Sequence, residues 1–372
     1  MEYGGGTGAV STAVVSRMMG SIVFAPLVNI FGSRKIIICT DLLRGFVMLA
    51  FWLLAILGSQ NVILFSLLVG LNMFFAGGFE AALQSFIPTI SDELRKANAD
   101  LSTGRNFVQL IGLLSGGILM EMYFGLGFLI NAVTFLLASL VAIFLKVEDL
   151  KTGLSSDSKV FRQFFHKLKQ DFRKARKAIV ESRPLRLAFV STFFVSTLSF
   201  PMGTLIAPLV QETAGGNSIL FSIIESSIVI GGLVGAFLMK KSKNNDSTFI
   251  LLGSLLCGLS MLIVAIGSHS IILIVSMTVF GFASTIFNIA EYTIIQSSAE
   301  SLRAPIFSIL QFTSTCLYPV LSILSAMIVN LFNVKILFLI GGFLITLLFF
   351  VIIFNKKTVR VSKNVLSEKE KI

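Results

Sequence analysis

Long runs of apolar residues follow one another along almost the whole chain, from residue 9 to residue 354, and only short polar turns separate them. Each run is long enough for a helix that crosses a bilayer, which takes about 20 apolar residues. The runs are unbroken and lack the alternation of apolar and polar residues that is typical of the strands of a membrane barrel. The pattern therefore predicts an all-α, polytopic membrane protein.

The same pattern predicts eleven membrane spans, whose ends are defined to within a few residues. They cover residues 9 to 31, 37 to 57, 62 to 87, 104 to 122, 126 to 145, 187 to 209, 218 to 239, 248 to 267, 271 to 296, 305 to 329 and 334 to 354. The first run is too long for a signal peptide and no basic region precedes it, so we expect it to stay in the mature chain.

The composition agrees with a membrane protein and excludes several other classes. Hydrophobic residues make up 55% of the chain and charged residues 13%, and the mean hydropathy of +0.90 lies outside the range of soluble domains. The three cysteines lie inside predicted spans, and the two histidines lie in different loops, so neither a disulfide framework nor metal-ligand spacing is indicated. Serine–histidine, HExxH, paired-aspartate and P-loop patterns are absent from the sequence. We therefore expect neither an enzyme nor a bound cofactor.

Basic residues gather on one side of the predicted spans. The net charge is +11, and if the turn at residues 32 to 35 is cytoplasmic, every lysine and arginine except Arg17 and Lys335 lies on or near that side. This distribution follows the positive-inside rule and predicts a multi-pass protein of the cell membrane with a cytoplasmic C-terminus. We attribute the charge to topology, with attraction to anionic membrane lipid as a second use, and expect no nucleic-acid partner.

One long loop, residues 146 to 186, holds twelve basic and five acidic residues. Its segment FRQFFHKLKQDFRKARKAIV spaces apolar residues at helical intervals among lysines and arginines, which predicts an amphipathic helix on the inner membrane face. A segment that binds calmodulin or nucleic acid is the alternative. We interpret the loop as the linker between an N-terminal bundle, residues 1 to 145, and a C-terminal bundle, residues 187 to 355, with a cytoplasmic tail at 356 to 372.

The two halves share a weak internal repeat. The third span ends in LQSFIPTISDELRKAN and the ninth in IIQSSAESLRAP, with Gln-Ser, an acidic residue and Leu-Arg in the same order. Parallel repeats of this kind occur in transporters built from two six-helix halves. The second half has six predicted helices and the first has five, so we expect one N-terminal helix to be absent. A misplaced start, a fragment and a real loss all remain open.

The turn after the first span reads NIFGSRK, and TDLLRG follows it. These stretches resemble transporters of the major facilitator superfamily, in the bacterial drug-efflux branch that is similar to macrolide efflux proteins and the enterobactin exporter. The resemblance implies twelve helices in two bundles, and a charge cluster at this turn that latches the inner gate. A plain positive-inside anchor is the alternative. The residues that match are Arg34, Lys35, Asp41 and Arg44, whereas Asn29 and Ile30 depart from the pattern.

A second stretch, GRNFVQLIGLLSGG at residues 104 to 117, resembles the fifth helix of antiporters in the superfamily, which carries Gly-Pro-x-x-Gly-Gly. Gly112, Gly116 and Gly117 match, and Leu113 replaces the proline. Close helix packing alone also explains glycines at this spacing. FGLGFLINAVTFLLASL and SIIESSIVIGGLVG resemble the same branch, whereas APIFS departs from its Gly-Arg-Val-Phe-Ser. The resemblance favours export over uptake.

Four ionisable residues lie well inside predicted spans: Arg17, Glu80, Glu225 and Glu291. Each costs at least about 2.5 kcal/mol at the bilayer centre, so each is expected to face a cavity or a partner. Glu80 and Glu291 lie in corresponding helices of the two halves. A partly desolvated carboxylate in such a place is a candidate for proton coupling, and a structural hydrogen bond to a neighbouring helix is the alternative.

The remaining polar residues of the spans suggest a cavity. Gln84 and Gln296 follow the two acids by about one turn, and we predict that they line the cavity. Arg17 and Glu225 lie in the outer thirds of corresponding spans, where they can form an outer gate pair or attract a charged substrate.

Together these features predict a secondary active transporter. It would export a hydrophobic or amphipathic small molecule, such as a drug, a macrolide-like compound or a siderophore, by proton antiport with alternating access. Its partners would be the substrate, protons and membrane lipid, it would act as a monomer, and its energy would come from the proton gradient. The alternative is a truncated, non-transporting remnant or a membrane-embedded partner protein that keeps the fold.

Overall fold

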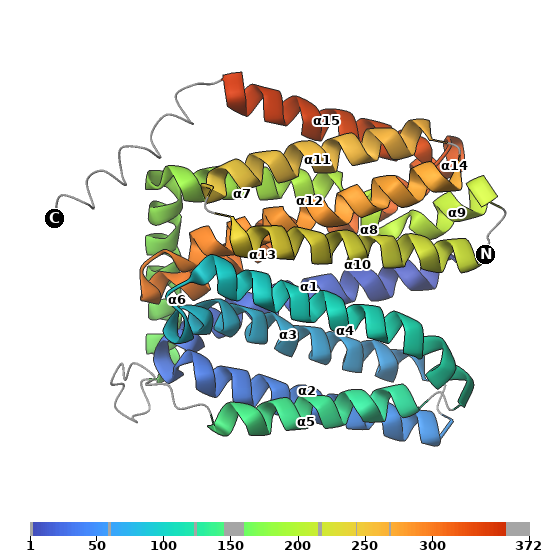
Figure 1. Cartoon of the computed structure of the whole chain (residues 1–372). Helices are drawn as coiled ribbons and strands as arrows, with labels where there is room; N and C mark the ends of the chain where they lie inside the picture. Colours follow the sequence, from blue (N-terminus) through green and yellow to red (C-terminus); the bar gives the residue numbers. More distant parts are fainter. Residues whose placement is uncertain are drawn as a thin grey trace.

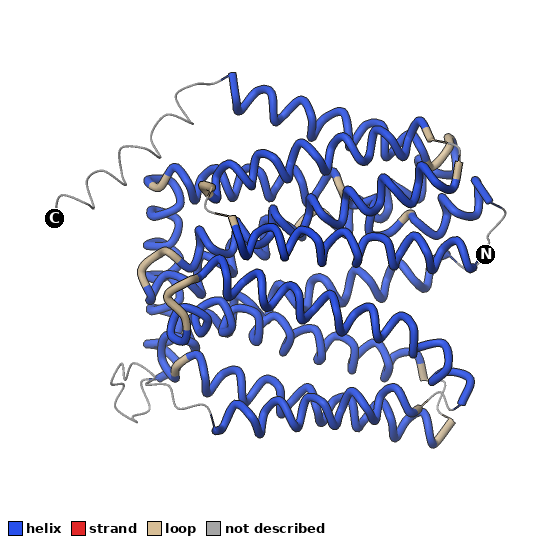
Figure 2. Tube along the Cα trace, in the orientation of Figure 1, coloured by secondary structure: helices blue, strands red, loops and turns tan. Residues whose placement is uncertain are grey.

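The structure is a computed structural model that describes residues 3–58, 61–122, 125–144, 160–214, 218–242, 244–267 and 269–354. Throughout these ranges the chain is helical apart from short connections, and none of these residues forms a strand (Figure 2). The all-α class predicted from the apolar runs is confirmed. The first part of the predicted linker and the predicted tail lie outside the described residues, and the predicted domain limits stay predictions.

The helices of the first half and the linker are bounded as follows: α1 Tyr3–Phe31, α2 Ser33–Ile56, α3 Val62–Ile90, α4 Leu94–Met122, α5 Leu126–Phe144 and α6 Val160–Glu181. Those of the second half are α7 Arg183–Leu198, α8 Phe200–Thr204, α9 Ile206–Ala214, α10 Ser218–Lys241, α11 Asp246–Ile266, α12 Ser270–Gln296, α13 Glu300–Thr315, α14 Tyr318–Leu331 and α15 Lys335–Phe354.

Within the described ranges, 9 helical segments are long and apolar enough to cross a membrane. The two other predicted spans are α4, whose first turns carry several charges, and the region that the hydropathy pattern treated as one span at residues 187 to 209. That region is three short helices, and the first break falls between α7 and α8 because Pro201, at the start of α8, has no N–H to continue the hydrogen bonding of α7. Pro319 similarly lies at the start of α14, after the break that follows α13.

Figure 1 shows α1–α5 on one side of the molecule and α7–α15 on the other, which we call the first and second helix sets. Helix α6 stands across the helix ends, and we call this end of the molecule the α6 end. In the first set α1 packs along α3 and α2 along α5, and in the second α10 packs along α12 and α11 along α15. Helix α4 packs mainly along α10, so it joins the two sets.

Glycines let α1 and α3 cross with their backbones in contact. A Cβ atom on Gly20 would lie 1.9 Å from the carbonyl oxygen of Phe74, and one on Gly77 would lie 2.0 Å from the carbonyl oxygen of Arg17. Only glycine fits at such separations. The crossing therefore fixes α3 against the turn of α1 that carries Arg17.

The second set repeats this crossing between α10 and α12. A Cβ atom on Gly231 would lie 1.9 Å from the carbonyl oxygen of Thr278, and one on Gly281 would lie 1.9 Å from that of Ile228. In both crossings each glycine meets a carbonyl three residues before the partner glycine. The internal repeat read from the sequence thus has a counterpart in the packing of the helices.

Large apolar side chains cover the outer faces of the helices. Ile63 is 82% exposed, Ile266 77% and Phe144 75%. Exposure on this scale is unusual for a protein surrounded by water and is expected where lipid covers the surface.

Candidate functional site

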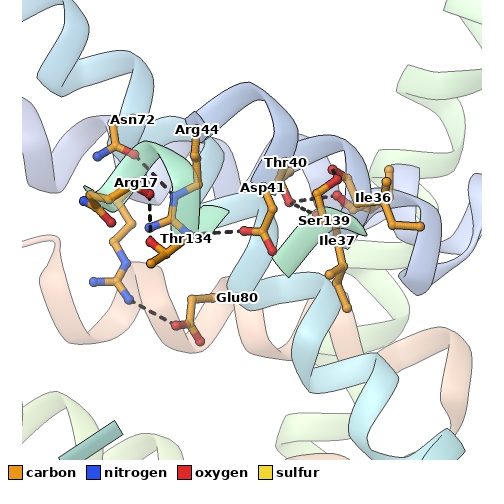
Figure 3. A network of polar contacts seen from close by, with 12 residues as sticks. Arg17, Ile36, Ile37, Thr40, Asp41, Arg44, Asn72, Glu80, Thr134 and Ser139 are labelled. Atoms are coloured by element: carbon orange, nitrogen blue, oxygen red, sulfur yellow. Dashed lines mark hydrogen bonds and ion pairs between the residues drawn. The ribbon is translucent and has the colours of Figure 1, made fainter. Parts of the chain in front are cut away.

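Glu80 of α3 lies between two arginines. Its Oε1 atom accepts a hydrogen bond from Nη2 of Arg105 on α4 at 3.0 Å, and Nη2 of Arg17 on α1 lies 3.8 Å from the same oxygen. Figure 3 shows Arg17 and Glu80 pointing toward each other. The side chain of Glu80 is 13% exposed, whereas those of Arg17 and Arg105 are 41% and 40% exposed. We call these three residues the Arg17–Glu80–Arg105 cluster.

The cluster lies deep within the helices. Glu80 precedes the end of α3 at Ile90, and Arg105 follows the start of α4 at Leu94. At 1.5 Å per residue each is about 15 Å from its helix end, well inside the helix. Arginine or glutamate at that depth costs several kcal/mol without a partner or a polar cavity. The sequence predicted that Arg17 and Glu80 need partners, and the structure makes them partners of each other.

Helix α12 brings a residue of the second set to the cluster. Tyr292 packs in the same cluster of side chains as Ala81, the residue after Glu80. Its ring also packs on Phe307 of α13, with ring centroids 5.9 Å apart. The cluster therefore lies where the two helix sets meet.

Glu291, the residue before Tyr292, has a different environment from Glu80. It is 3% exposed, and one of its oxygens contacts Oγ1 of Thr192 on α7. The same Oγ1 lies 2.8 Å from the carbonyl oxygen of Ala188. A hydroxyl group has one proton to donate, and a carbonyl oxygen can only accept. If Thr192 donates to Ala188, the proton in its contact with Glu291 belongs to the carboxyl group.

Buried amide side chains link the two sets on the α6 side of the cluster. Gln296 of α12 donates to Oε1 of Gln84 on α3 at 2.7 Å, and Asn98 of α4 donates to Oε1 of Gln296 at 2.6 Å. Gln84 and Gln296 are 0% exposed and Asn98 is 2% exposed. Gln84 and Gln296, expected from the sequence to line a cavity, are thus brought together in a buried network, which we call the amide cluster. Asn98 was not foreseen.

Ion pairs at the α6 end also join the sets. Arg95 of α4 donates from Nε to Asp246 of α11 at 2.8 Å and from Nη1 to the carbonyl of Ser242 at 2.8 Å. Lys240 of α10 lies 2.6 Å from Asp100 of α4. Sequence reasoning treated these basic residues only as indicators of topology. Acidic residues near the same turns, Asp100 and Asp246, could have indicated ion pairs. Which acid pairs with which base depends on how α4 packs along α10, and the sequence does not give this packing.

Asn29, one of the two residues that depart from the pattern of the drug-efflux branch, contacts two other segments at the α6 end. Its Nδ2 atom donates to Asp171 of α6 at 3.1 Å and to the carbonyl oxygen of Ser301 on α13 at 2.8 Å. A neutral amide therefore joins α1 to the amphipathic helix and to the second set.

The predicted gate cluster is divided into two parts. Arg34 donates from Nε to the carbonyl oxygen of Ala142 at 3.0 Å, and also contacts the carbonyl of Ile143, at the end of α5. An arginine near the last carbonyls of a helix satisfies them and interacts favourably with the helix dipole. Lys35 is exposed.

Asp41 and Arg44 form the other part, farther along α2. Their charged atoms are 3.6 Å apart, and Nε of Arg44 donates to Oδ1 of Asn72 on α3 at 3.3 Å (Figure 3). The guanidinium also lies over the ring of Phe135 on α5, 4.0 Å from its centroid, where a cation–π contact stabilises it. The charge of Arg44 is thus held inside the first helix set.

The remaining predicted site residues are not gathered into one site. A Cβ atom on Gly112 would meet nothing within 4 Å, and the surroundings of Gly116 and Gly117 lie outside the described side chains. Glu225 of α10 is partly exposed, and Arg17 pairs with Glu80 and not with Glu225 among the described contacts. A mostly apolar groove of about 530 Å³ lies between α10 and α12; its lining includes Ser222, Ile223, Ser226, Ile230, Ile274 and Thr278 but not Glu225.

The sequence matches the family model of the Major Facilitator Superfamily over residues 4–321, and the chain belongs to this superfamily. It is therefore a membrane transporter by family and fold, as the sequence motifs predicted at that level. A curated relative, the uncharacterized MFS-type transporter YvqJ of Bacillus subtilis (strain 168), is 24% identical over 351 residues, covering 91% of this chain and 82% of the relative.

Solved structures show the same fold at low identity. The human organic anion transporter MFSD10 superposes with a TM-score of 0.75 and 13% identity, covering 93% of this chain and 83% of that one. The E. coli fucose:proton symporter FucP superposes with a TM-score of 0.71 and 16% identity, covering 95% and 91%. At these identities the likeness concerns the fold alone.

Proposed function

We propose that this protein exports a small organic solute across the bacterial cell membrane by alternating access, in exchange for protons. The observation that carries the proposal is the Arg17–Glu80–Arg105 cluster, a charged site well inside the helices where the two helix sets meet. Ionisable residues inside the membrane destabilise a transport protein unless they are paired or solvated, so they are rare there. Those that occur commonly mark the path of a substrate or an ion. In this proposal the α6 end faces the cytoplasm, in agreement with the positive-inside rule.

The contacts at the α6 end support a state that is closed toward the cytoplasm. The amide cluster and the pairs made by Arg95 and Lys240 all cross between α3 or α4 and the second helix set. A transition to the opposite state has to break these bonds together. Because they break together, the interface is expected to have two discrete arrangements, closed and open. Substrate would enter from the cytoplasm only in that second state.

Glu291 is the residue that we assign to proton coupling. Its burial, its single hydroxyl partner and the hydrogen-bond donor count at Thr192 fit a protonated carboxyl group in this state. Because it lies near the end of α12 at Gln296, opening of the α6 end would hydrate it and allow the proton to leave toward the cytoplasm. Glu80, which is paired with Arg17 and Arg105, is assigned no part in proton coupling.

Export is the direction that the Gly112, Gly116 and Gly117 motif favours by resemblance. The open space at Gly112 means that close packing does not explain this glycine in the present state. We expect α4 to approach a neighbouring helix there in the other state, where the absence of a side chain would matter.

The test is solute-dependent proton movement in proteoliposomes of the full chain, with a pH-sensitive dye inside and a panel of fluorescent solutes of each charge. We expect at least one solute to leave against its gradient when protons flow in the other direction, and this exchange to disappear with an uncoupler or in Glu291→Gln. Export that continues in the presence of an uncoupler would rule out proton coupling. Solute transport driven by protons in the opposite direction would rule out export.

A further inference from the structure

The Arg17–Glu80–Arg105 cluster has more positive than negative charge. Two guanidinium groups share one carboxylate oxygen, Oε1 of Glu80. Asp41 and Arg44 pair with each other. Glu291, the residue before Tyr292, is assigned a protonated carboxyl group in the function proposed above. Tyr292, which packs in the same cluster of side chains as Ala81, the residue after Glu80, is an uncharged phenol at neutral pH. An excess of one positive charge therefore remains in the cluster.

The two arginines have more hydrogen-bond donors than their contacts with Glu80 use. Each guanidinium presents five N–H donors, and Nε of Arg17 is buried without a hydrogen-bond partner. The Arg17–Glu80 distance of 3.8 Å is too long for a hydrogen bond, so Arg17 is held near Glu80 by charge alone. Arg17 can accept a second acidic group without losing an existing hydrogen bond to Glu80.

The exposed parts of these side chains indicate a space between the helix sets. Arg17 and Arg105 expose 41% and 40% of their side chains. An arginine at this depth that faced lipid would be strongly disfavoured, because hydrocarbon cannot solvate its charge. The exposed parts of the two side chains therefore face a polar space, and a guanidinium in such a place binds carboxylate or phosphate groups through paired, charge-assisted hydrogen bonds.

We propose that the transported solute is an organic anion, whose carboxylate or phosphate group is bound by Arg17 and Arg105, with Glu80 as the internal anion that it displaces. The proposal rests on the transport function proposed above and names its substrate class. When the site is empty, Glu80 balances part of the positive charge. When the solute binds, its oxyanion takes over the contact with Arg105, and the ring of Tyr292 provides an apolar surface for the rest of the molecule.

This assignment fits the direction of transport. The cell interior is electrically negative, so the membrane potential favours the exit of an anion. Exchange of one monovalent anion for one incoming proton would move two elementary positive charges inward per cycle, and the transport would be electrogenic.

The binding test uses a matched series on the purified full-length protein without any proton gradient: 2-naphthoate, 1-naphthyl phosphate, the neutral 1-naphthalenemethanol and the cationic 1-naphthylmethylammonium. Binding is measured by the rise in the unfolding midpoint with ligand concentration. We expect the carboxylate or the phosphate, or both, to stabilise the protein, and the neutral and cationic members to have no effect. The comparison of the two anions identifies which oxyanion the site prefers.

Variants separate a binding role from a structural one. Arg105→Gln should weaken anion binding at least tenfold, and Arg105→Lys, which keeps the charge but not the paired donors, should weaken it less. Glu80→Gln should strengthen anion binding several-fold, because it removes the competing carboxylate; a purely structural ion pair would show no such gain. Arg173→Gln, at an exposed arginine of α6, is the matched control and should bind anions as the unchanged protein does.

If the neutral or cationic member binds best, or if Glu80→Gln weakens anion binding as much as Arg105→Gln does, the proposal is overturned. Anion binding without proton-coupled export would leave this inference standing and remove the proposed function. Proton-coupled export of cations alone would overturn this inference and leave the proposed function standing.

Discussion

Gln296 of α12 donates a hydrogen bond to Gln84 of α3, and both side chains are completely buried between the two helix sets. The pair is the centre of the amide cluster, in which every bond crosses from the first set to the second. A buried amide that loses its partner costs roughly 1 to 3 kcal/mol, so this contact bears directly on the stability of the closed α6 end.

Replacing Gln296 by Met should favour opening of the α6 end, because it leaves the amides of Gln84 and Asn98 without their shared partner. The distance between spin labels at residues 96 and 241, on a background without the native cysteines, measures the opening. We expect the distribution to shift toward longer distances. The double variant Gln84→Met with Gln296→Met should recover part of the closed state, since it leaves fewer orphaned groups; equal opening in both would contradict this role.

The ion pair between Arg95 and Asp246 should contribute to the same closed state. Asp246→Asn removes one charge of a hydrogen-bonded pair, and such charged bonds contribute roughly 1.5 to 3 kcal/mol. With the same spin labels we expect partial opening. The exchanged pair, Arg95→Asp with Asp246→Arg, should close the α6 end again, and failure of the exchange to restore closure would show that Arg95 acts mainly through its bond to Ser242.

Glu291→Gln should abolish the exchange of protons for solute while the protein keeps its fold. Glutamine keeps the size of the protonated acid and can donate to Oγ1 of Thr192, but it cannot release a proton. We expect solute-driven proton flux in proteoliposomes to fall at least tenfold, with little change in the unfolding midpoint. Unchanged proton flux would remove Glu291 from the coupling mechanism.

Two glycines should differ sharply in their tolerance of alanine. Gly77→Ala places a methyl group against the carbonyl oxygen of Arg17, and overpacking of this kind costs typically 1 to 3 kcal/mol. Gly112→Ala meets open space and should leave the unfolding midpoint unchanged. Transport by Gly112→Ala then reports on the other state: a stable protein with reduced transport would indicate close packing at this position after the transition.

The apolar runs were sufficient to predict the fold class, because helices are the only structures that satisfy their own backbone hydrogen bonds within a single span. The break at Pro201 was visible in the sequence but is not registered by hydropathy, so three short helices were predicted as one span. The need of Glu80 for a partner also followed from its depth in the membrane. The identity of Arg105 as that partner did not, since it depends on how α4 is rotated and packed between the two helix sets.

The internal repeat likewise predicted more likeness between Glu80 and Glu291 than the structure has. Both residues lie in helices that pack in corresponding ways, but their partners come from α1 and α4 in one case and from α7 in the other. Because a repeat in sequence constrains the backbone path more than the facing side chains, similar positions acquired different electrostatic surroundings.

The backbone contact at Gly20 and Gly77 makes α1 and α3 a single rigid body. Arg17 and Glu80 are attached to this body and keep their separation whatever the rest of the molecule does. Arg105 belongs to α4, which packs mainly along α10 of the other helix set. The distance from Glu80 to Arg105 therefore reports which helix set α4 follows in the transport cycle: it stays constant if α4 moves with α3 and lengthens if α4 moves with α10, while the distance from Glu80 to Arg17 provides a constant reference.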